Sequence, residues 1–218
     1  MAPIVSIVGR SKSGKTRLIE KLVTELRKRG YRVATIKHAQ EIHFEPGKDS
    51  WRHLEAGSET TVVAAPDQIV LIKPTKSMAT VGDIARVIGN DYDIILTEGF
   101  KQSNVPKIEV HRSQSGPLLE GIRKVIAIVT DEPLDTKTRQ FPSDDVKALA
   151  DLLEKGFIVP QSNRLNLYIN NTPVTLTHFP KQIISNVLEA MVTSLKGMGE
   201  ISSLEIFLKR ESKKTKNN

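Results

Sequence analysis

The chain alternates between short apolar runs and longer amphipathic segments, a pattern typical of an α/β protein. Apolar runs predict buried parallel strands at residues 4–8, 32–37, 92–98 and 124–130, and a shorter alternating strand at 107–112. Helical spacing of apolar residues predicts helices at 16–30, 50–56, 80–88 and 144–157. The runs 61–65 and 68–72, separated by Pro66-Asp67, predict a hairpin at the sheet edge. Together these segments predict a mainly parallel sheet flanked by helices.

The pattern changes after a polar, turn-rich joint at 159–164. Alternating residues at 165–176 predict a hairpin, an apolar helical pattern follows at 183–195, and alternation returns at 204–208. These segments predict a small ββαβ unit that buries little by itself and is expected to dock on the main domain or on another copy. The sequence therefore divides into a main domain at 1–158, an α+β extension at 164–210 and a basic tail at 211–218.

Composition narrows the class of protein. A chain of 218 residues with 39% hydrophobic residues suffices for one ordinary domain and a smaller one. The sequence contains no cysteine, which excludes disulfides, thiolate metal sites and a cysteine nucleophile. No segment has the length of a membrane span, and the N-terminus lacks the features of a signal peptide, so we expect a cytoplasmic protein with no membrane partner.

The net charge of +7 is concentrated at the C-terminal end. The last ten residues hold five basic residues against one acidic residue and contribute +4, which leaves +3 for the rest. A polar tail of this kind is expected to be disordered and solvated. Because no aromatic residues are interleaved with these charges, the sequence does not indicate a nucleic-acid partner.

The most specific motif is the octapeptide Gly9, Arg10, Ser11, Lys12, Ser13, Gly14, Lys15 and Thr16. It fits the phosphate-loop (Walker A) pattern G-x-x-x-x-G-K-[ST] at every position. The glycines allow a turn that aims backbone N–H groups at phosphate oxygens, Lys15 can reach the outer phosphates, and the Thr16 hydroxyl can ligate Mg²⁺. The predicted strand before the loop and helix after it are the context that this motif requires.

The run 32–37 completes a βαβ unit with the loop, so parallel pairing of its two strands and a right-handed crossover are expected. Beyond it lies a polar segment at the sheet edge where parallel strands place ligand-binding loops. His38, His43, Glu45 and Asp49 in this segment have the chemistry of metal or Mg²⁺-water ligands, although isolated loop residues are more often solvated.

Two acidic residues end predicted strands. Glu98 ends the strand 92–98, and a nucleotide-bound Mg²⁺ needs such a carboxylate, whereas Asp93 is expected only to begin that strand. Asp131 follows the strand 124–130, from where an aspartate reads the base in many guanine-specific domains, but the usual Asn-Lys-x-Asp motif is missing. The residues alone therefore leave ATP and GTP open.

Five short motifs occur together in a fixed order: Gly9–Thr16, Ile36-Lys37-His38, Gly47-Lys48-Asp49-Ser50 with Glu55-Ala56-Gly57, Glu98-Gly99-Phe100-Lys101, and Ala127-Ile128-Val129-Thr130-Asp131. This set resembles the molybdopterin-guanine dinucleotide biosynthesis protein B (MobB) family over about residues 4–155. Family members commonly have a longer, histidine-richer segment between the Lys37-His38 pair and the motif that begins at Gly47. Only His38 and His43 stand there in this sequence, so the resemblance assigns them no metal role.

The resemblance implies a phosphate-loop fold, a homodimer, and GTP binding with Mg²⁺ and at most slow GTPase activity. It also implies a partner, the guanylyltransferase that joins GMP to molybdopterin, without distinguishing molybdenum from tungsten pathways or giving the extension a role. The nucleotide-binding residues that it implies are Gly9, Arg10, Ser11, Lys12, Ser13, Gly14, Lys15, Thr16, Lys101 and Asp131. Thr16 and Glu98 would serve Mg²⁺, and Lys15, Glu98 and Asp49 are the candidates for a catalytic role.

Slow hydrolysis agrees with the residues, because no arginine finger or water-positioning glutamine stands in a recognisable motif. Arg10 or Arg112 could supply positive charge, in the same chain or across a dimer. Two alternatives stay open. A small-molecule kinase of this fold would need an acceptor base and an arginine-rich lid, and no lid is evident. A nucleotide-switched interaction module would use the ββαβ unit for docking.

Overall fold

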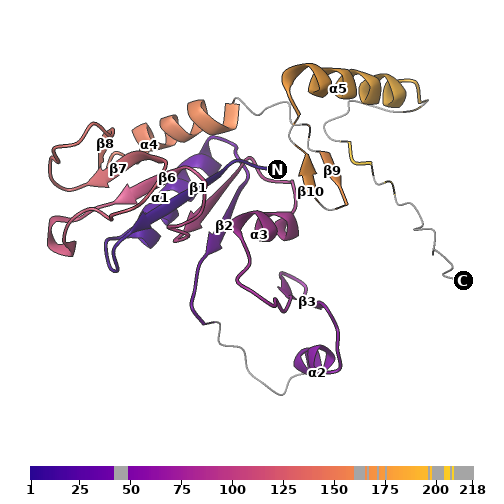
Figure 1. Ribbon diagram of the computed structural model, residues 1–218, viewed down its shortest axis with the longest axis horizontal. Coiled ribbons are helices and arrows are strands. Elements are labelled where there is room, and N and C mark those ends of the chain that lie inside the picture. The colour runs from indigo at the N-terminus through magenta and orange to yellow at the C-terminus, as the bar shows by residue number, and fades with distance from the viewer. Residues whose placement is uncertain are drawn as a thin grey trace, which may run out of the picture. The chain divides into compact units, whose positions relative to one another are not determined.

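The computed structural model describes residues 1–41, 49–159, 165, 167–170, 172–174, 176–195, 197, 204–206 and 208. The chain divides into two compact units, Met1–Arg164 and Leu165–Asn218. Figure 1 traces the chain from the indigo N-terminal strand onward. The predicted site residues within the described ranges all belong to the first unit.

The first unit is built on a six-stranded sheet in which all neighbouring strands are parallel. In spatial order the strands are β2 (Val33–Lys37), β5 (Ile94–Glu98), β1 (Ile4–Gly9), β6 (Lys107–Val110), β7 (Val125–Thr130) and β8 (Gln140–Pro142). The chain moves to one side of β1 for β2 and β5 and to the other side from β6 onward. Ligands bind at such a reversal point, outside the carboxyl ends of the strands.

Helices cover both faces of the sheet (Figure 1). On one face lie α1 (Lys15–Lys28) and α4 (Val146–Leu153), which continues into a π-helical turn (Glu154–Ile158). On the other face α3 (Val81–Ile88) packs over β2 and β5. The predicted parallel sheet flanked by helices is therefore confirmed. No helix in the described part of the chain is both long and apolar enough to span a bilayer.

An ion-pair network joins α1 to α4. The Arg29 guanidinium contacts Asp151 and Glu154 at 2.6 Å each and Glu25 at 3.0 Å. The hydrogen bonds that Arg29 donates to these carboxylates, the one to Asp151 first, raise the pKa of Arg29. The network fixes the end of α1 that lies farthest from the phosphate loop.

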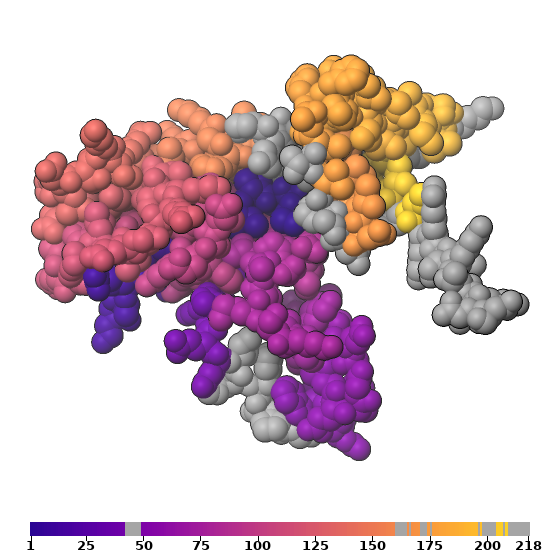
Figure 2. All heavy atoms as spheres, viewed as in Figure 1, coloured from indigo at the N-terminus to yellow at the C-terminus, as the bar shows by residue number. Residues whose placement is uncertain are grey.

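The predicted hairpin forms from β3 (Thr61–Ala64) and β4 (Ile69–Ile72), after the short helix α2 (Asp49–Glu55). Its predicted place at the edge of the main sheet is wrong, because the two strands form a separate two-stranded sheet. The turn at Pro66-Asp67 makes β3 and β4 antiparallel, so they pair with each other and at most one of them could run parallel to the edge strand β2. The hairpin side chains are largely exposed, as the purple region of Figure 2 shows.

Two other features of the sheet differ from the prediction. The strands of the predicted βαβ unit, β1 and β2, are parallel but not neighbours, because β5 lies between them. The edge strand β8 was not predicted. It has only three residues and ends in Pro142, which an edge strand tolerates.

The connection from β5 to β6, residues 99–106, contains no helix. A fully buried lysine, Lys107, holds it in place: its Nζ donates to the carbonyl oxygens of Ser103, Val105 and Arg123 at 2.5, 3.0 and 3.2 Å. Burial lowers the pKa of Lys107. One side chain thus bonds carbonyl groups that a helix would have satisfied internally.

The second unit begins with an antiparallel hairpin of β9 (Leu167–Ile169) and β10 (Thr172–Val174), with Asn170 at φ 50° in its turn. The helix α5 (His178–Thr193) follows. The ββα part of the predicted unit is therefore present.

The last predicted strand is not formed in the described part of its segment, because Leu204–Ile206 and Leu208 have no regular secondary structure. Alternation makes a strand possible, but hydrogen bonds to a neighbouring strand define it. The tail 211–218, predicted to be disordered, lies outside the described residues.

Candidate functional site

The phosphate-loop motif connects the central strand β1 to α1. Gly9, Lys12 and Gly14 have φ values of 150°, 60° and 92°. Gly9 lies directly against the neighbouring strand β6, and a Cβ there would come 2.4 Å from the Val110 carbonyl oxygen. Gly14 caps α1 in a left-handed conformation that suits glycine. The predicted strand, tight loop and helix are therefore present.

The ammonium group of Lys15 lies across the loop, and its Nζ donates to the Arg10 carbonyl oxygen at 2.6 Å. Burial lowers the pKa of Lys15, Glu98 opposes this effect, and the charges of Lys101 and Lys37 add to it. The positive charges of Lys37 and Lys101 thus lie close enough to repel Lys15, while the Glu98 carboxylate attracts it. A bound anion would relieve their repulsion.

The two predicted Mg²⁺ ligands lie side by side. The Thr16 hydroxyl donates to Glu98 Oε2 at 2.9 Å, although the residues are 82 positions apart in the sequence. A hydroxyl and a carboxylate are the oxygen donors that Mg²⁺ takes together with phosphate oxygens and water. This pair fits Mg²⁺.

A cavity of about 750 Å³ opens beside the loop and has the size of a small-molecule site. Its walls come from the loop, the start of α1, the segment after β6, the end of β7 and the turn after β8. They carry four cationic side chains against two carboxylates, a net charge of +2: Lys12, Arg17, Lys21 and Arg112 against Asp131 and Asp144. This balance favours an anionic ligand.

Asp131 lies in this wall, and its Oδ1 accepts a hydrogen bond from the Ser113 backbone N–H at 3.1 Å. Its predicted role near the base stays a prediction. Asp49 forms an ion pair with Arg52 on its own helix at 3.5 Å and is 88% exposed. No contact between Asp49 and the loop is found among the described residues, so its role also stays a prediction.

The family model for molybdopterin guanine dinucleotide synthesis protein B matches residues 4–131, more than half of the chain. The chain belongs to the MobB family. It is similar to the molybdopterin-guanine dinucleotide biosynthesis adapter protein of Haemophilus influenzae, with 36% identity over 70% of this chain and 88% of that protein. The adapter protein of Escherichia coli is 33% identical over 70% of this chain and 92% of its own length.

Solved MobB structures have the same fold. A crystal structure of molybdopterin-guanine biosynthesis protein B aligns with a TM-score of 0.57 and 30% identity, over 71% of this chain and 99% of that chain. A MobB homologue from Bacillus stearothermophilus aligns with a TM-score of 0.55 and 25% identity, over 70% and 96% of the two chains.

The first histidine after β2 is exposed and stacks on an aromatic ring of this MobB-family domain. The rings of His38 and Phe100 stack with their centroids 4.7 Å apart, and the His38 N–H donates to the Glu98 carbonyl oxygen at 3.0 Å. His43 and Glu45 lie outside the described residues. Within the described ranges, no group of three or more histidine, aspartate and glutamate side chains is arranged to hold a metal ion.

Two basic residues of the cavity, Arg17 and Lys21, were not among the predicted site residues. Their spacing of four places them on one helical face, and that face starts at the loop. This spacing was the signal that could have identified them.

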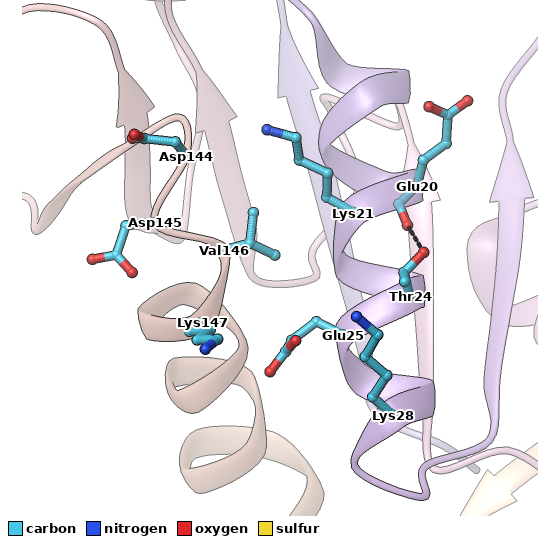
Figure 3. Close-up of a pocket in the computed structure, with 9 residues that line it drawn as sticks. All are labelled: Glu20, Lys21, Thr24, Glu25, Lys28, Asp144, Asp145, Val146 and Lys147. Carbon is cyan, nitrogen blue, oxygen red and sulfur yellow. Dashed lines mark hydrogen bonds between the residues drawn. The ribbon is translucent and has the colours of Figure 1, made fainter.

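A second hollow lies between α1 and the start of α4 (Figure 3). It measures about 460 Å³, and in the figure side chains from the two helices face one another across it. Its charged lining holds four carboxylates and three lysines: Glu20, Glu25, Asp144, Asp145, Lys21, Lys28 and Lys147. With no excess of positive charge it suits a nucleotide less well, so we place the site in the cavity beside the loop.

The Glu109 carboxylate is buried on the sheet face opposite α1, where its Oε1 accepts the Leu119 N–H at 2.6 Å. Burial raises the pKa of Glu109, so the folded state binds its proton more tightly than the unfolded state. Stability from this group is present at low pH and is lost as pH rises through the folded pKa. Glu109→Gln keeps the acceptor and removes the ionisation. We expect it to melt a few degrees above wild type at pH 7.

Melting curves of both proteins from pH 4 to pH 8 check this expectation. The two melting temperatures should converge near pH 4, where the wild-type carboxyl is protonated. A variant less stable than wild type at pH 7 would contradict it.

Proposed function

We propose that the chain is a GTP-binding accessory protein of molybdopterin guanine dinucleotide biosynthesis that assists the guanylyltransferase. Relatives with 33% and 36% identity are named adapter proteins of this biosynthesis, which supports the pathway. The observation that carries nucleotide binding is the 2.9 Å contact between Thr16 and Glu98 at the foot of the phosphate loop.

In this proposal the loop N–H groups and the N-terminus of α1 bind the phosphates. Lys15 exchanges the Arg10 carbonyl oxygen for an outer phosphate oxygen. Thr16 and Glu98 hold Mg²⁺, which supplies neutralisation of phosphate charge when bound. Lys101 adds positive potential beside the same phosphates.

The guanine assignment is supported by the names of the relatives, which are adapter proteins of molybdopterin-guanine dinucleotide biosynthesis. Asp131, which lines the cavity, is the candidate residue for contacting guanine. We propose slow hydrolysis at most, because the sequence holds no motif for positioning the attacking water. Binding and presentation of nucleotide would then be the main activity.

We also propose that the protein is a homodimer, and the exposed hairpin supports this. Val62, Ile69 and Leu71 are 54%, 73% and 45% exposed, although they are large and apolar. An isolated two-stranded hairpin is marginal in water, and exposed apolar patches commonly mark interfaces.

Calorimetric titration of the full chain with GTP and with ATP, each with Mg²⁺, tests the nucleotide assignment. We expect GTP to bind more tightly than ATP, and Lys15→Ala to weaken GTP binding about tenfold or more, because it removes a charge-assisted contact to phosphate. Lys28→Ala, at the far end of α1, is a matched control and should bind GTP like wild type.

Two outcomes would overturn parts of the proposal. Tighter binding of ATP would refute the guanine assignment and favour a kinase of the same fold. Binding of neither nucleotide by a folded wild-type protein would refute the nucleotide role of the loop.

A further inference from the structure

One wall of the cavity is formed by Arg112, Gln114 and Ser115. They belong to the segment 112–119, which we call the wall segment. Arg10 of the phosphate loop donates through Nε to the Pro117 carbonyl oxygen at 2.8 Å. At its other end the Ser113 N–H donates to the Asp131 carboxylate at 3.1 Å. The wall segment is therefore bonded both to the loop and to the end of β7.

Arg112, the first residue of this segment, is partly buried against the start of α1. Its Nη1 donates to the His111 carbonyl oxygen at 2.8 Å. Its Nη2 lies 3.7 Å from the position that a Cβ on Gly14 would occupy. A guanidinium has five N–H donors in a fixed plane, so the bond to His111 leaves donors available for a ligand in the cavity.

A second observation at the same place also indicates a ligand. Ser13 is 1% exposed, lines the cavity, and its Oγ has no hydrogen-bond partner in the described part of the chain. A buried hydroxyl without a partner costs free energy, which an oxygen of a bound ligand would offset. Ser13 and the guanidinium of Arg112 adjoin the same residue, Gly14.

We propose that Arg112 is a nucleotide-binding residue that contacts the part shared by nucleoside diphosphates and triphosphates, and not the terminal phosphate. The proposal rests on the nucleotide binding proposed above. Lys15, Thr16 and Glu98 mark the end of the site for the outer phosphates and the metal. Arg112 instead shares the cavity wall with Asp131, at the nucleoside end. The arginine acts within its own chain, because the wall segment fixes it beside its own loop.

Arg112→Gln in the full chain tests this role, by titration with GDP and with GTP in the presence of Mg²⁺. We expect both affinities to fall by the same factor, about tenfold or more, because a contact to the shared phosphates is lost from both ligands. Arg112→Lys should recover part of the loss, since it restores the charge without the planar fork. Arg123→Gln removes an exposed arginine at the opposite end of the sheet and should bind like wild type.

The outcomes separate this inference from the proposed function. A loss confined to GTP would place Arg112 at the terminal phosphate, and equal affinity of variant and wild type for both ligands would give it no binding role; either result overturns the inference alone. Failure of wild type to bind GDP or GTP would overturn the nucleotide assignment and this inference with it. Unchanged melting of the unliganded variant shows that a loss of affinity is not a loss of folding.

Discussion

Gly9→Ala is expected to destabilise the protein by about 3–5 kcal/mol and to abolish nucleotide binding. A Cβ at this position would lie 2.4 Å from the Val110 carbonyl oxygen and 2.8 Å from Ser13 Oγ. The first contact is with backbone of the neighbouring strand, which can move only if β1 and β6 separate. The residue also has a φ of 150°, which side chains rarely adopt. Chemical denaturation and GTP titration measure the two effects.

Gly30→Ala separates the steric effect from the backbone effect. Gly30 has a φ of 89° at the end of α1, and a Cβ there would have no heavy atom within 4 Å. The free energy of unfolding of this variant should therefore fall only by what alanine costs at positive φ, roughly 1–2 kcal/mol. Its affinity for GTP should not change. If Gly9→Ala lost no more stability than Gly30→Ala, the close approach between the loop and β6 would not be needed for the fold.

All strands of the main sheet except β8, and the phosphate loop itself, could be predicted because their determinants are local. The loop motif, the apolar strand before it and the helix after it are contiguous in the sequence, so one short stretch contains the information. Glu98 was found because it ends an apolar strand, and parallel strands bring their carboxyl ends to one edge. That reasoning placed Thr16 and Glu98 together before their 2.9 Å contact was known.

The part of the cavity that is lined by Arg112 and Asp131 was harder to predict, because its walls come from segments far apart in the sequence. Arg112 was considered for its charge, but its position beside Gly14 depends on the order of β1 and β6 in the sheet. Strand order follows from connections whose direction the apolar pattern does not encode. The edge strand β8 was missed for another reason: its three residues are too few to form a recognisable apolar or alternating run.

The hairpin and the last strand show a different limit. The pattern predicted correctly that 61–72 forms paired strands, and wrongly that they join the edge of the main sheet. Alternation of apolar and polar residues indicates that a segment can form a strand. Which neighbouring strand it pairs with depends on the arrangement of the rest of the chain. The exposed hairpin of the described chain thus agrees with a partner outside it, which the proposed homodimer would supply.

The connection between β5 and β6 contains no helix, and the hydrogen bonds of Lys107 to its carbonyl groups can be tested by substitution. Lys107→Met is expected to destabilise the protein by about 2–4 kcal/mol, because methionine fills similar volume but leaves three carbonyl groups, those of Ser103, Val105 and Arg123, without the donor that the buried lysine supplies. The substitution also removes the desolvation cost of the buried charge. The expected loss of stability is therefore smaller than the summed contributions of the three hydrogen bonds. Urea denaturation measures the change.

Lys124→Met is the matched control. Lys124 is exposed and donates to a single carbonyl oxygen of the same connection, that of Asn104, at 3.0 Å. Water can replace that donor, so the control should change stability by no more than about 0.5 kcal/mol. Hydrogen exchange adds a local readout. Relative to wild type, Lys107→Met should accelerate amide exchange in residues 99–106 more than in α4, because the connection loses the hydrogen bonds that hold it. If Lys107→Met and wild type were equally stable, the desolvation cost of the buried ammonium group would equal the stabilisation from its three hydrogen bonds. The lysine would then determine the path of the connection without adding to the stability of the fold.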